Sequence, residues 1–341
     1  MRRHLIPLAA LLAATPALPQ ASANIAAGRT QASPLAPSEI VNAAPKSDWA
    51  AITASDLLVM DLAPNATGKP RRVVIQLMPA PFSQGWIGNI RKLAAARFWD
   101  GTSINRVQDN YVVQWGDANA EDKAKAKALP GDLVEVPEAC YSLSQIPSRC
   151  SSGELDGVIE QLGADAEDSD DPQDWRARDP YASWTAFVKG WPVGLVQSNS
   201  DKEWSVSPVH CYGMVGVGRD MPPNTGTGAE LYTVIGHAPR HLDRNIALVG
   251  RVIEGIEHLS SLPRGTGALG FYETPEERTA IVSIRIGTEV SGLPAYEYLS
   301  TESESFARYA DARANRRDAF FIRPAGGADV CNIPVPVRRV K

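Results

Sequence analysis

The sequence predicts a mainly β protein, and three observations support this fold class. With 44% hydrophobic and 21% charged residues, the composition is that of an ordinary globular chain, which excludes disorder throughout, collagen and coiled coil. The 27 glycines and 26 prolines indicate many turns, as in a β-rich fold. Short runs of apolar and β-branched residues, bounded by turn residues, recur along the chain and are typical of strands. The length of 341 residues allows one large domain or two small ones.

The apolar pattern predicts the helices and strands one by one. Residues 86–98 carry apolar side chains at helical spacing, which predicts an amphipathic helix. Residues 253–259 and 305–317 predict two further helices. We expect the strands at residues 57–60, 72–77, 103–107, 110–115, 213–217, 231–235, 246–252 and 279–287.

The N-terminus has the features of a secretory signal peptide. Two arginines precede an apolar stretch at residues 5–18, and Ala21-Ser22-Ala23 provides a cleavage site. An uncleaved membrane anchor is the alternative, but the apolar run is short and proline interrupts it. We therefore expect a signal peptide at residues 1–23, a periplasmic location, and no membrane span after cleavage.

Changes in composition predict the remaining boundaries. Residues 24–54 are rich in Ala, Ser and Pro, which predicts a flexible linker. Residues 55–288 contain the predicted strands and form the main domain. Within this domain, residues 118–205 hold two cysteines, an acidic run and isolated aromatic residues, and we interpret them as a long insertion. Residues 289–341 are polar and form a C-terminal extension.

Four cysteines follow the signal peptide, and an even number in an exported chain predicts disulfides. Three pairings are possible. We favour Cys140 with Cys150, because the two are close in sequence and flank a loop, which leaves Cys211 with Cys331. Four unpaired thiols are the alternative.

Two blocks of the sequence resemble the signature of the cyclophilins, the β-barrel class of peptidyl-prolyl cis-trans isomerases. The first block, residues 98–117, contains Asn105-Arg106-Val107 and Gln114-Trp115-Gly116-Asp117, similar to the family's Phe-His-Arg-Val and Gln-Gly-Gly-Asp. The second, residues 213–259, contains Pro223-Asn224-Thr225 and Glu230-Leu231-Tyr232, similar to its Pro-Asn-Thr and Gln-Phe-Phe. Because the blocks keep the family order, the chain is identified as a divergent bacterial, exported member.

The resemblance implies both a fold and a site. The fold is a closed antiparallel β-barrel with two capping helices, here with the long insertion and the C-terminal extension. The catalytic arginine of the family falls on Arg106 and its partner glutamine on Gln114. The residues that bind the substrate proline fall on Tyr111, Val112, Glu230, Leu231, Tyr232, His241 and Leu242.

Several of these positions depart from the family pattern, which reduces the activity we expect. Compared with the usual family residues, the chain has Tyr for Phe at Tyr111 and Tyr232, Glu for Gln at Glu230, Asn for His at Asn105, His for Trp at His241 and Ile for His at Ile246. At position 230, we expect the carboxylate to form an ion pair with Arg106 that competes with the substrate carbonyl.

Other site chemistries are not favoured. His237 and His241 have the spacing of metal ligands on a helix, but Pro239 interrupts the helix, so we expect no metal. His210 could activate the neighbouring Cys211 only if that thiol were free. No cofactor motif is present. The formal charge of −5, without a basic cluster, predicts no binding to nucleic acid.

We therefore expect a peptidyl-prolyl cis-trans isomerase that acts on X-Pro bonds of exported proteins, as a monomer and without a cofactor. The alternatives are a non-catalytic peptide-binding chaperone and a cell-envelope scaffold, each of which would retain the cyclophilin cleft.

Overall fold

The computed structural model describes residues 34–144, 150, 156–169, 171, 174–200 and 202–340. The predicted signal peptide and the first part of the predicted linker lie outside these residues. Among the described residues, no helix is long and apolar enough to cross a membrane.

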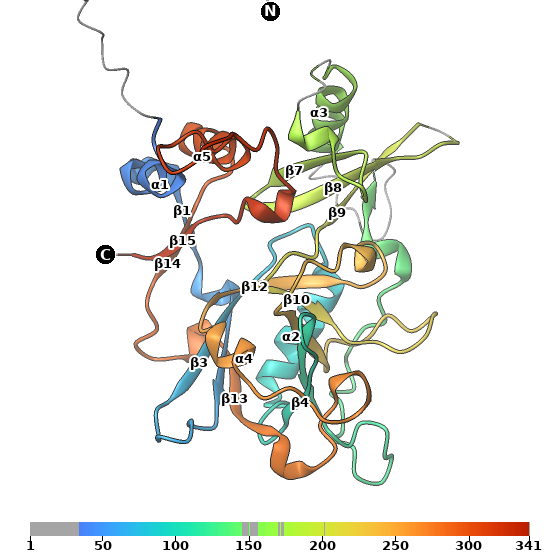
Figure 1. Ribbon diagram of the computed structural model, residues 1–341. Helices are drawn as coiled ribbons and strands as arrows, with labels where there is room; N and C mark the ends of the chain where they lie inside the picture. Colours follow the sequence, from blue (N-terminus) through green and yellow to red (C-terminus); the bar gives the residue numbers. More distant parts are fainter. Residues whose placement is uncertain are drawn as a thin grey trace, which may run out of the picture. The chain divides into compact units, whose positions relative to one another are not determined.

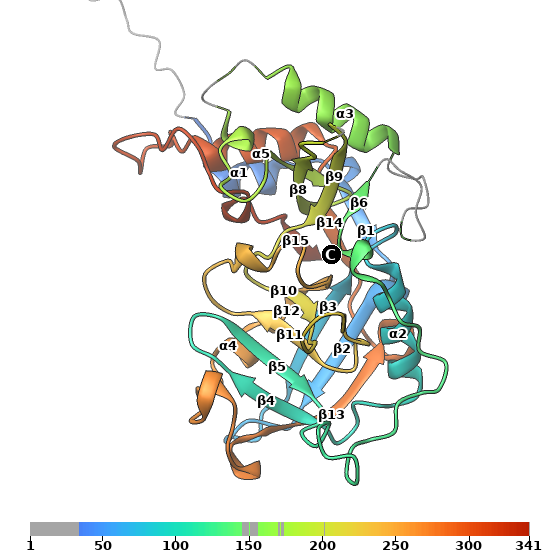
Figure 2. The ribbon, with the colours of Figure 1, turned by 90° about the vertical axis from the view of Figure 1, so that its right-hand side faces the viewer.

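Eight strands close into an antiparallel barrel, as the resemblance implies (Figures 1 and 2). Around the barrel the order is β10-β11-β5-β4-β13-β2-β3-β12. The bounds are β2 Leu57–Leu62, β3 Arg71–Leu77, β4 Ser103–Val107, β5 Val112–Gly116, β10 Met214–Val217, β11 Leu231–Val234, β12 Leu248–Glu254 and β13 Thr279–Ile286. Each predicted strand is present, with ends shifted by a few residues at most.

Two helices pack on the barrel. Helix α2 (Gln84–Ala95) buries Trp86, Ile90 and Leu93 in the same apolar core as the barrel strands. The Trp86 indole N–H is within 3.1 Å of the carbonyl oxygens of Thr225 and Gly226, which ties the helix to the loop before β11. Helix α4 (Glu257–Ser260) is shorter than predicted and buries Leu259.

The insertion forms a second antiparallel sheet with the order β6-β9-β8-β7. The bounds are β6 Leu143–Ser144, β7 Trp184–Val188, β8 Trp191–Gln197 and β9 Trp204–Pro208, and helix α3 spans Asp156–Glu167. The isolated tryptophans of the sequence (Trp184, Trp191 and Trp204) are buried and share one apolar core with the barrel. Strand β9 extends to Pro208, beyond residue 205, where we predicted the insertion to end.

The two ends of the described chain meet in a third sheet with the order β1-β14-β15. The bounds are β1 Trp49–Ile52, β14 Tyr296–Leu299 and β15 Val337–Arg339, and the packed helices are α1 (Pro37–Ala43) and α5 (Glu304–Ala314). The prediction of a flexible linker at residues 24–54 is therefore wrong for the part that contains α1 and β1. Ile40 and Trp49 are buried against Phe306 and Leu299 of the extension, a partnership that composition alone does not reveal.

Two disulfides join Cys140 to Cys150 and Cys211 to Cys331, so all four cysteines of the sequence are paired. The favoured pairing is confirmed. The second disulfide links the loop before β10 to the C-terminal segment.

Candidate functional site

A chain of hydrogen bonds runs across three neighbouring strands on the face turned away from the barrel core. Arg106 of β4 lies opposite Gln114 of β5, and Gln114 lies opposite Tyr232 of β11. Arg106 Nη1 donates to Gln114 Oε1 (3.0 Å), and Gln114 Nε2 donates to Glu230 Oε1 (2.6 Å). The neighbours Val113 and Trp115 point into the core, so strand alternation turns Gln114 outward.

The Arg106 guanidinium is held from several sides. Its Nε donates to the carbonyl oxygen of Leu269 (2.8 Å), and its Nη2 donates to Gln108 Oε1. The rings of Tyr111 and Phe271 lie 5.6 and 5.2 Å from its central carbon. Burial lowers the pKa of Arg106, but an arginine remains charged at neutral pH. One N–H on each terminal nitrogen has no partner among the described residues, so two donors are available to a ligand.

Glu230 does not pair directly with Arg106, contrary to our expectation. Gln114 lies between them, accepting from the guanidinium through Oε1 and donating to the carboxylate through Nε2. Burial raises the pKa of the Glu230 carboxyl, and the Gln114 hydrogen bond opposes this rise. Glu230 thus orients the Gln114 amide rather than competing for Arg106.

An apolar patch adjoins this hydrogen-bonded chain. Val112, Tyr232 and Val234 are buried together on the outer face of β5 and β11, with Tyr111 and Ile246 packed against them. The Tyr232 ring lies over Gly216 of β10, where an added Cβ would come within 2.3 Å of the ring. A side chain at this glycine would therefore displace Tyr232.

The structure assigns the remaining predicted pocket residues to different environments. Leu231 is fully buried in the barrel core, because it alternates with Tyr232 along β11. The exposed His241 ring stacks on Tyr111, with centroids 6.4 Å apart. Leu242 is half-buried beside it in the short 3-10 helix Arg240–Leu242.

A buried network behind Tyr232 was not predicted. The Tyr232 hydroxyl lies 2.8 Å from His210 Nε2, and His210 Nδ1 lies 2.8 Å from Asp243. A neutral imidazole with its proton on Nδ1 satisfies both contacts, accepting from Tyr232 and donating to Asp243. Asp243 also accepts from Arg240 (2.6 Å), which forms two hydrogen bonds with Asp179 of the insertion. The network therefore connects the apolar patch to the insertion.

The network gives both His210 and Asp243 structural partners. Cys211 beside His210 is in a disulfide, so it offers no thiolate. Among the described residues, no group of three His, Cys, Asp or Glu side chains could hold a metal ion. In the sequence, the only notable neighbour of His210 is Cys211. No pattern predicts its contact with Tyr232, because Tyr232 lies 22 residues later, on strand β11.

Comparisons with known proteins identify the family. The family model for "Cyclophilin type peptidyl-prolyl cis-trans isomerase/CLD" matches residues 66–286. The chain belongs to the cyclophilin family. This cyclophilin is a peptidyl-prolyl cis-trans isomerase, an enzyme class whose substrates are proline-containing polypeptides.

Among solved structures, this cyclophilin is similar to AquaCyp293 from Hirschia baltica, with a TM-score of 0.57 and 19% identity over 86% of this chain and 94% of that chain. It also matches a Cryptosporidium parvum cyclophilin, cgd2_1660, with a TM-score of 0.34 and 11% identity over 67% of this chain and 98% of that chain. No match was found among curated protein sequences.

Proposed function

We propose that this cyclophilin isomerises X-Pro bonds of exported proteins, with Arg106 stabilising the twisted amide. The observation that supports this most strongly is the position of Arg106. It is held by protein acceptors, keeps two N–H donors without a partner among the described residues, and lies beside an apolar patch of Tyr111, Val112 and Tyr232.

The chemistry requires only a well-placed donor. Resonance gives the X-Pro bond partial double-bond character and a barrier of about 18–20 kcal/mol. As the bond rotates, the prolyl nitrogen loses conjugation and its lone pair becomes a hydrogen-bond acceptor. A fixed guanidinium then donates to this nitrogen in the twisted state only, so it lowers the barrier without stabilising the ground state equally.

The other residues position the substrate. Tyr111, Val112 and Tyr232 grip the proline ring, so that the other side of the bond rotates. Gln114 holds the Arg106 guanidinium and hydrogen-bonds the peptide backbone, and Glu230 orients the Gln114 amide. His241, which stacks on Tyr111, limits the motion of that ring.

The proposed site of action is the periplasm. The sequence features of residues 1–23 predict export, and two disulfides are consistent with an oxidising compartment. If the protein is exported in this way, its mature N-terminus is Asn24. N-terminal sequencing of the protein from a periplasmic fraction tests this, and an intact Met1 would contradict it.

The decisive experiment for the mechanism is Arg106→Ala, with Arg72→Ala as the matched control. Arg72 is an exposed arginine on β3 that pairs with Asp61. We expect Arg106→Ala to slow isomerisation of an Ala-Pro peptide by about 10²–10³-fold, as for loss of a charged transition-state donor. Arg72→Ala should keep the wild-type rate. Circular dichroism confirms that both variants are folded.

Two outcomes would overturn the proposal. If the wild type is active and Arg106→Ala keeps its full rate, Arg106 is not the donor. If the wild type is inactive but suppresses aggregation of unfolded proteins, the peptide-binding chaperone becomes the better description.

A further inference from the structure

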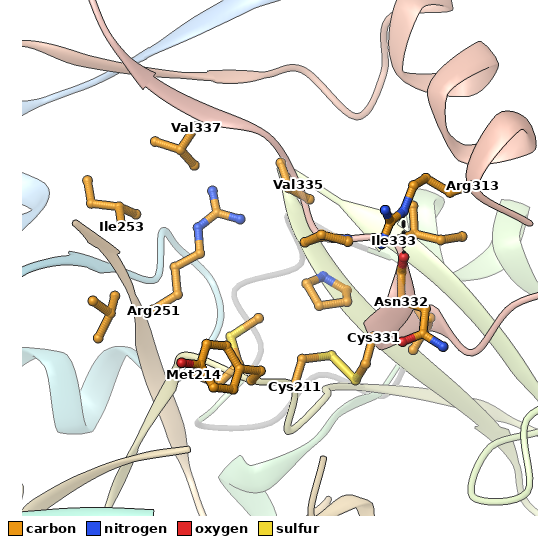
Figure 3. Close-up of a pocket in the computed structure, with 15 residues that line it drawn as sticks. Cys211, Met214, Arg251, Ile253, Arg313, Cys331, Asn332, Ile333, Val335 and Val337 are labelled. Atoms are coloured by element: carbon orange, nitrogen blue, oxygen red, sulfur yellow. Dashed lines mark hydrogen bonds between the residues drawn. A yellow bond between two sulfur atoms is a disulfide. The ribbon is translucent and has the colours of Figure 1, made fainter. Parts of the chain in front are cut away.

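A cavity of about 380 Å³ lies where three parts of the chain converge. Strand β12 of the barrel and Pro192 of β8 form part of its wall, and the C-terminal segment around the Cys211–Cys331 disulfide forms another part. The wall is mostly apolar and includes Met214, Ile253, Ile333 and Val335 (Figure 3). This cavity shares no residue with the isomerase site described above.

Arg251 lines the cavity and is only 7% exposed. Its Nε donates to Gln76 Oε1 (2.9 Å) and its Nη1 to the carbonyl oxygen of Gly190 (2.8 Å), so the plane of the guanidinium is fixed. The guanidinium also stacks on Trp191, 4.5 Å from the ring centroid. In Figure 3 its free end extends toward the space between Val337 and Val335.

The Arg251 charge has no counterion among the described residues. Its Nη2 is buried. Among the residues that the structure describes, this atom has no hydrogen-bond partner, and no Asp or Glu lines the cavity. Burial lowers the pKa of Arg251 to about 10, so the group is still charged at neutral pH. A buried cation without an anion is strongly unfavourable, and a buried donor without an acceptor adds to that cost.

The rest of the wall restricts what could neutralise this charge. Arg313 of α5 adds a second positive charge, and its Nε donates to the carbonyl oxygen of Asn332 (2.8 Å). The wall is more apolar than polar, which favours a ligand with a hydrocarbon body over a fully hydrated anion such as inorganic phosphate. The volume equals that of about a dozen water molecules, which suits a ligand of about ten non-hydrogen atoms.

We propose that this cavity binds a monocarboxylate with a hydrocarbon body. The carboxylate lies at the Arg251 side of the cavity, where it neutralises the charge of the guanidinium, and the hydrocarbon body packs against Ile253, Ile333 and Val335. Charge-assisted hydrogen bonds to a carboxylate are strong in a desolvated site, and burial of the hydrocarbon supplies the remaining affinity. Such a carboxylate could belong to a free acid or to the C-terminal residue of a polypeptide.

The test is calorimetric titration of the full-length mature protein with octanoate and, in parallel, with octanamide. The two differ in charge and have nearly the same size and hydrocarbon body. We expect octanoate to bind and to raise the unfolding temperature, and octanamide to bind about 10–100-fold more weakly, since its carbonyl oxygen can still accept a hydrogen bond but the attraction to the Arg251 charge is lost. Measurable binding of both compounds with the same affinity would overturn the proposal.

Three variants localise the binding. Arg251→Met removes the cation and should weaken octanoate binding by about 10–100-fold. Because Arg251 is buried and its replacement could prevent folding, Val335→Trp provides an independent test, since it fills the cavity and leaves the arginine in place. Arg72→Met, on the neighbouring strand β3, is the matched control and should bind like the wild type. Octanoate binding that survives Val335→Trp would contradict the proposed site.

A second pair of ligands distinguishes the two sources of the carboxylate. A short peptide ending in Leu-Val is titrated with a free C-terminus and with an amidated one. Binding of the free-acid peptide with no binding of octanoate would identify a polypeptide C-terminus as the ligand, and the reverse would identify a free acid. If neither acid binds, the proposal fails. None of these results depends on Arg106 or on isomerase activity.

Discussion

The carboxyl group of Glu230 lies at the end of the hydrogen-bonded chain and is partly buried. Its Oε1 accepts from Gln114, and an exposed carboxylate, Glu121, lines the same cavity of about 290 Å³ beside it. Burial is the main reason that the pKa of Glu230 is raised. At neutral pH the native state therefore bears the cost of a partly desolvated charge.

Glu230→Gln should stabilise this cyclophilin at pH 7 and leave its stability almost unchanged near pH 4. Because the folded pKa is above the unfolded value, the wild type loses stability as the pH rises from the unfolded pKa through the folded pKa. The variant removes this loss and still offers an amide oxygen to Gln114. Urea unfolding at both pH values, with Glu121→Gln as the control, measures the effect. An equal gain at pH 4 and pH 7 would contradict the electrostatic explanation.

Tyr232 differs from a phenylalanine only in its hydroxyl, and in this chain that hydroxyl has a buried partner. Burial raises the pKa of Tyr232 well above its ordinary value, so the phenol remains a donor to His210. The contact explains how a tyrosine is tolerated in an apolar patch.

Tyr232→Phe should lower the free energy of unfolding by about 1–3 kcal/mol, because His210 Nε2 is left buried without a partner. The ring remains over Gly216, so isomerase activity should change much less than in Arg106→Ala. Tyr298→Phe is the matched control, because the Tyr298 hydroxyl has no hydrogen-bond partner among the described residues. Denaturant unfolding of both variants tests this, and equal losses would argue against the His210 contact.

At the scale of elements, strands β5, β10 and β11 combine to form the floor of the site. Val112 and Gln114 of β5 and Tyr232 of β11 point outward into the site. Strand β10 contributes no side chain here, but it leaves room for those of its neighbours. Gly216 lies opposite Tyr232 and leaves room for its ring, and Gly218 leaves room for Glu230. The shape of the site thus depends on two glycines that carry no chemistry.

Gly216→Ala should raise the KM for a proline peptide and lower stability by about 1–3 kcal/mol, as overpacking does. The new Cβ would come within 2.3 Å of the Tyr232 ring and displace it. Gly88→Ala on α2 is the control, since nothing lies within 4 Å of its added Cβ and alanine favours the helix. An unchanged KM in Gly216→Ala would show that the position of Tyr232 does not matter for binding.

At the scale of the whole molecule, the insertion and the C-terminal extension are attached to the barrel by several independent contacts. Tryptophans of the insertion share its core, and the buried pair Arg240–Asp179 joins the insertion to the segment after β11. The Cys211–Cys331 disulfide closes a loop with a sequence separation of 120, whereas Cys140–Cys150 closes one of 10.

Replacing Cys211 and Cys331 together by serine should lower the free energy of unfolding by about 5 kcal/mol, against about 3 kcal/mol for Cys140 and Cys150. The reason is that a longer closed loop restricts the unfolded chain more. Denaturant unfolding of the two double variants measures the difference. Equal losses would indicate that native-state contacts, rather than loop length, determine the contribution of each disulfide.

Most of the predicted site residues lie within two short segments of the chain, and the structure brings these segments together. Arg106, Tyr111, Val112 and Gln114 come from one hairpin, Glu230 directly precedes strand β11, and Tyr232 lies at the start of that strand. The placement of Leu231 in the pocket was wrong, because adjacent residues of a strand point to opposite faces.

In the sequence alone, local patterns predicted the barrel strands and helices α2 and α5, and the short spacing of Cys140 and Cys150 favoured the pairing that the structure contains. Each of these is marked by a local period, a turn residue or a short motif. The contacts between distant segments are visible only in three dimensions: β1 with β14, His210 with Tyr232, and Arg251 with an apolar cavity. These contacts join residues far apart in the chain and depend on the packing of buried side chains. A pattern of near neighbours carries no information about such contacts.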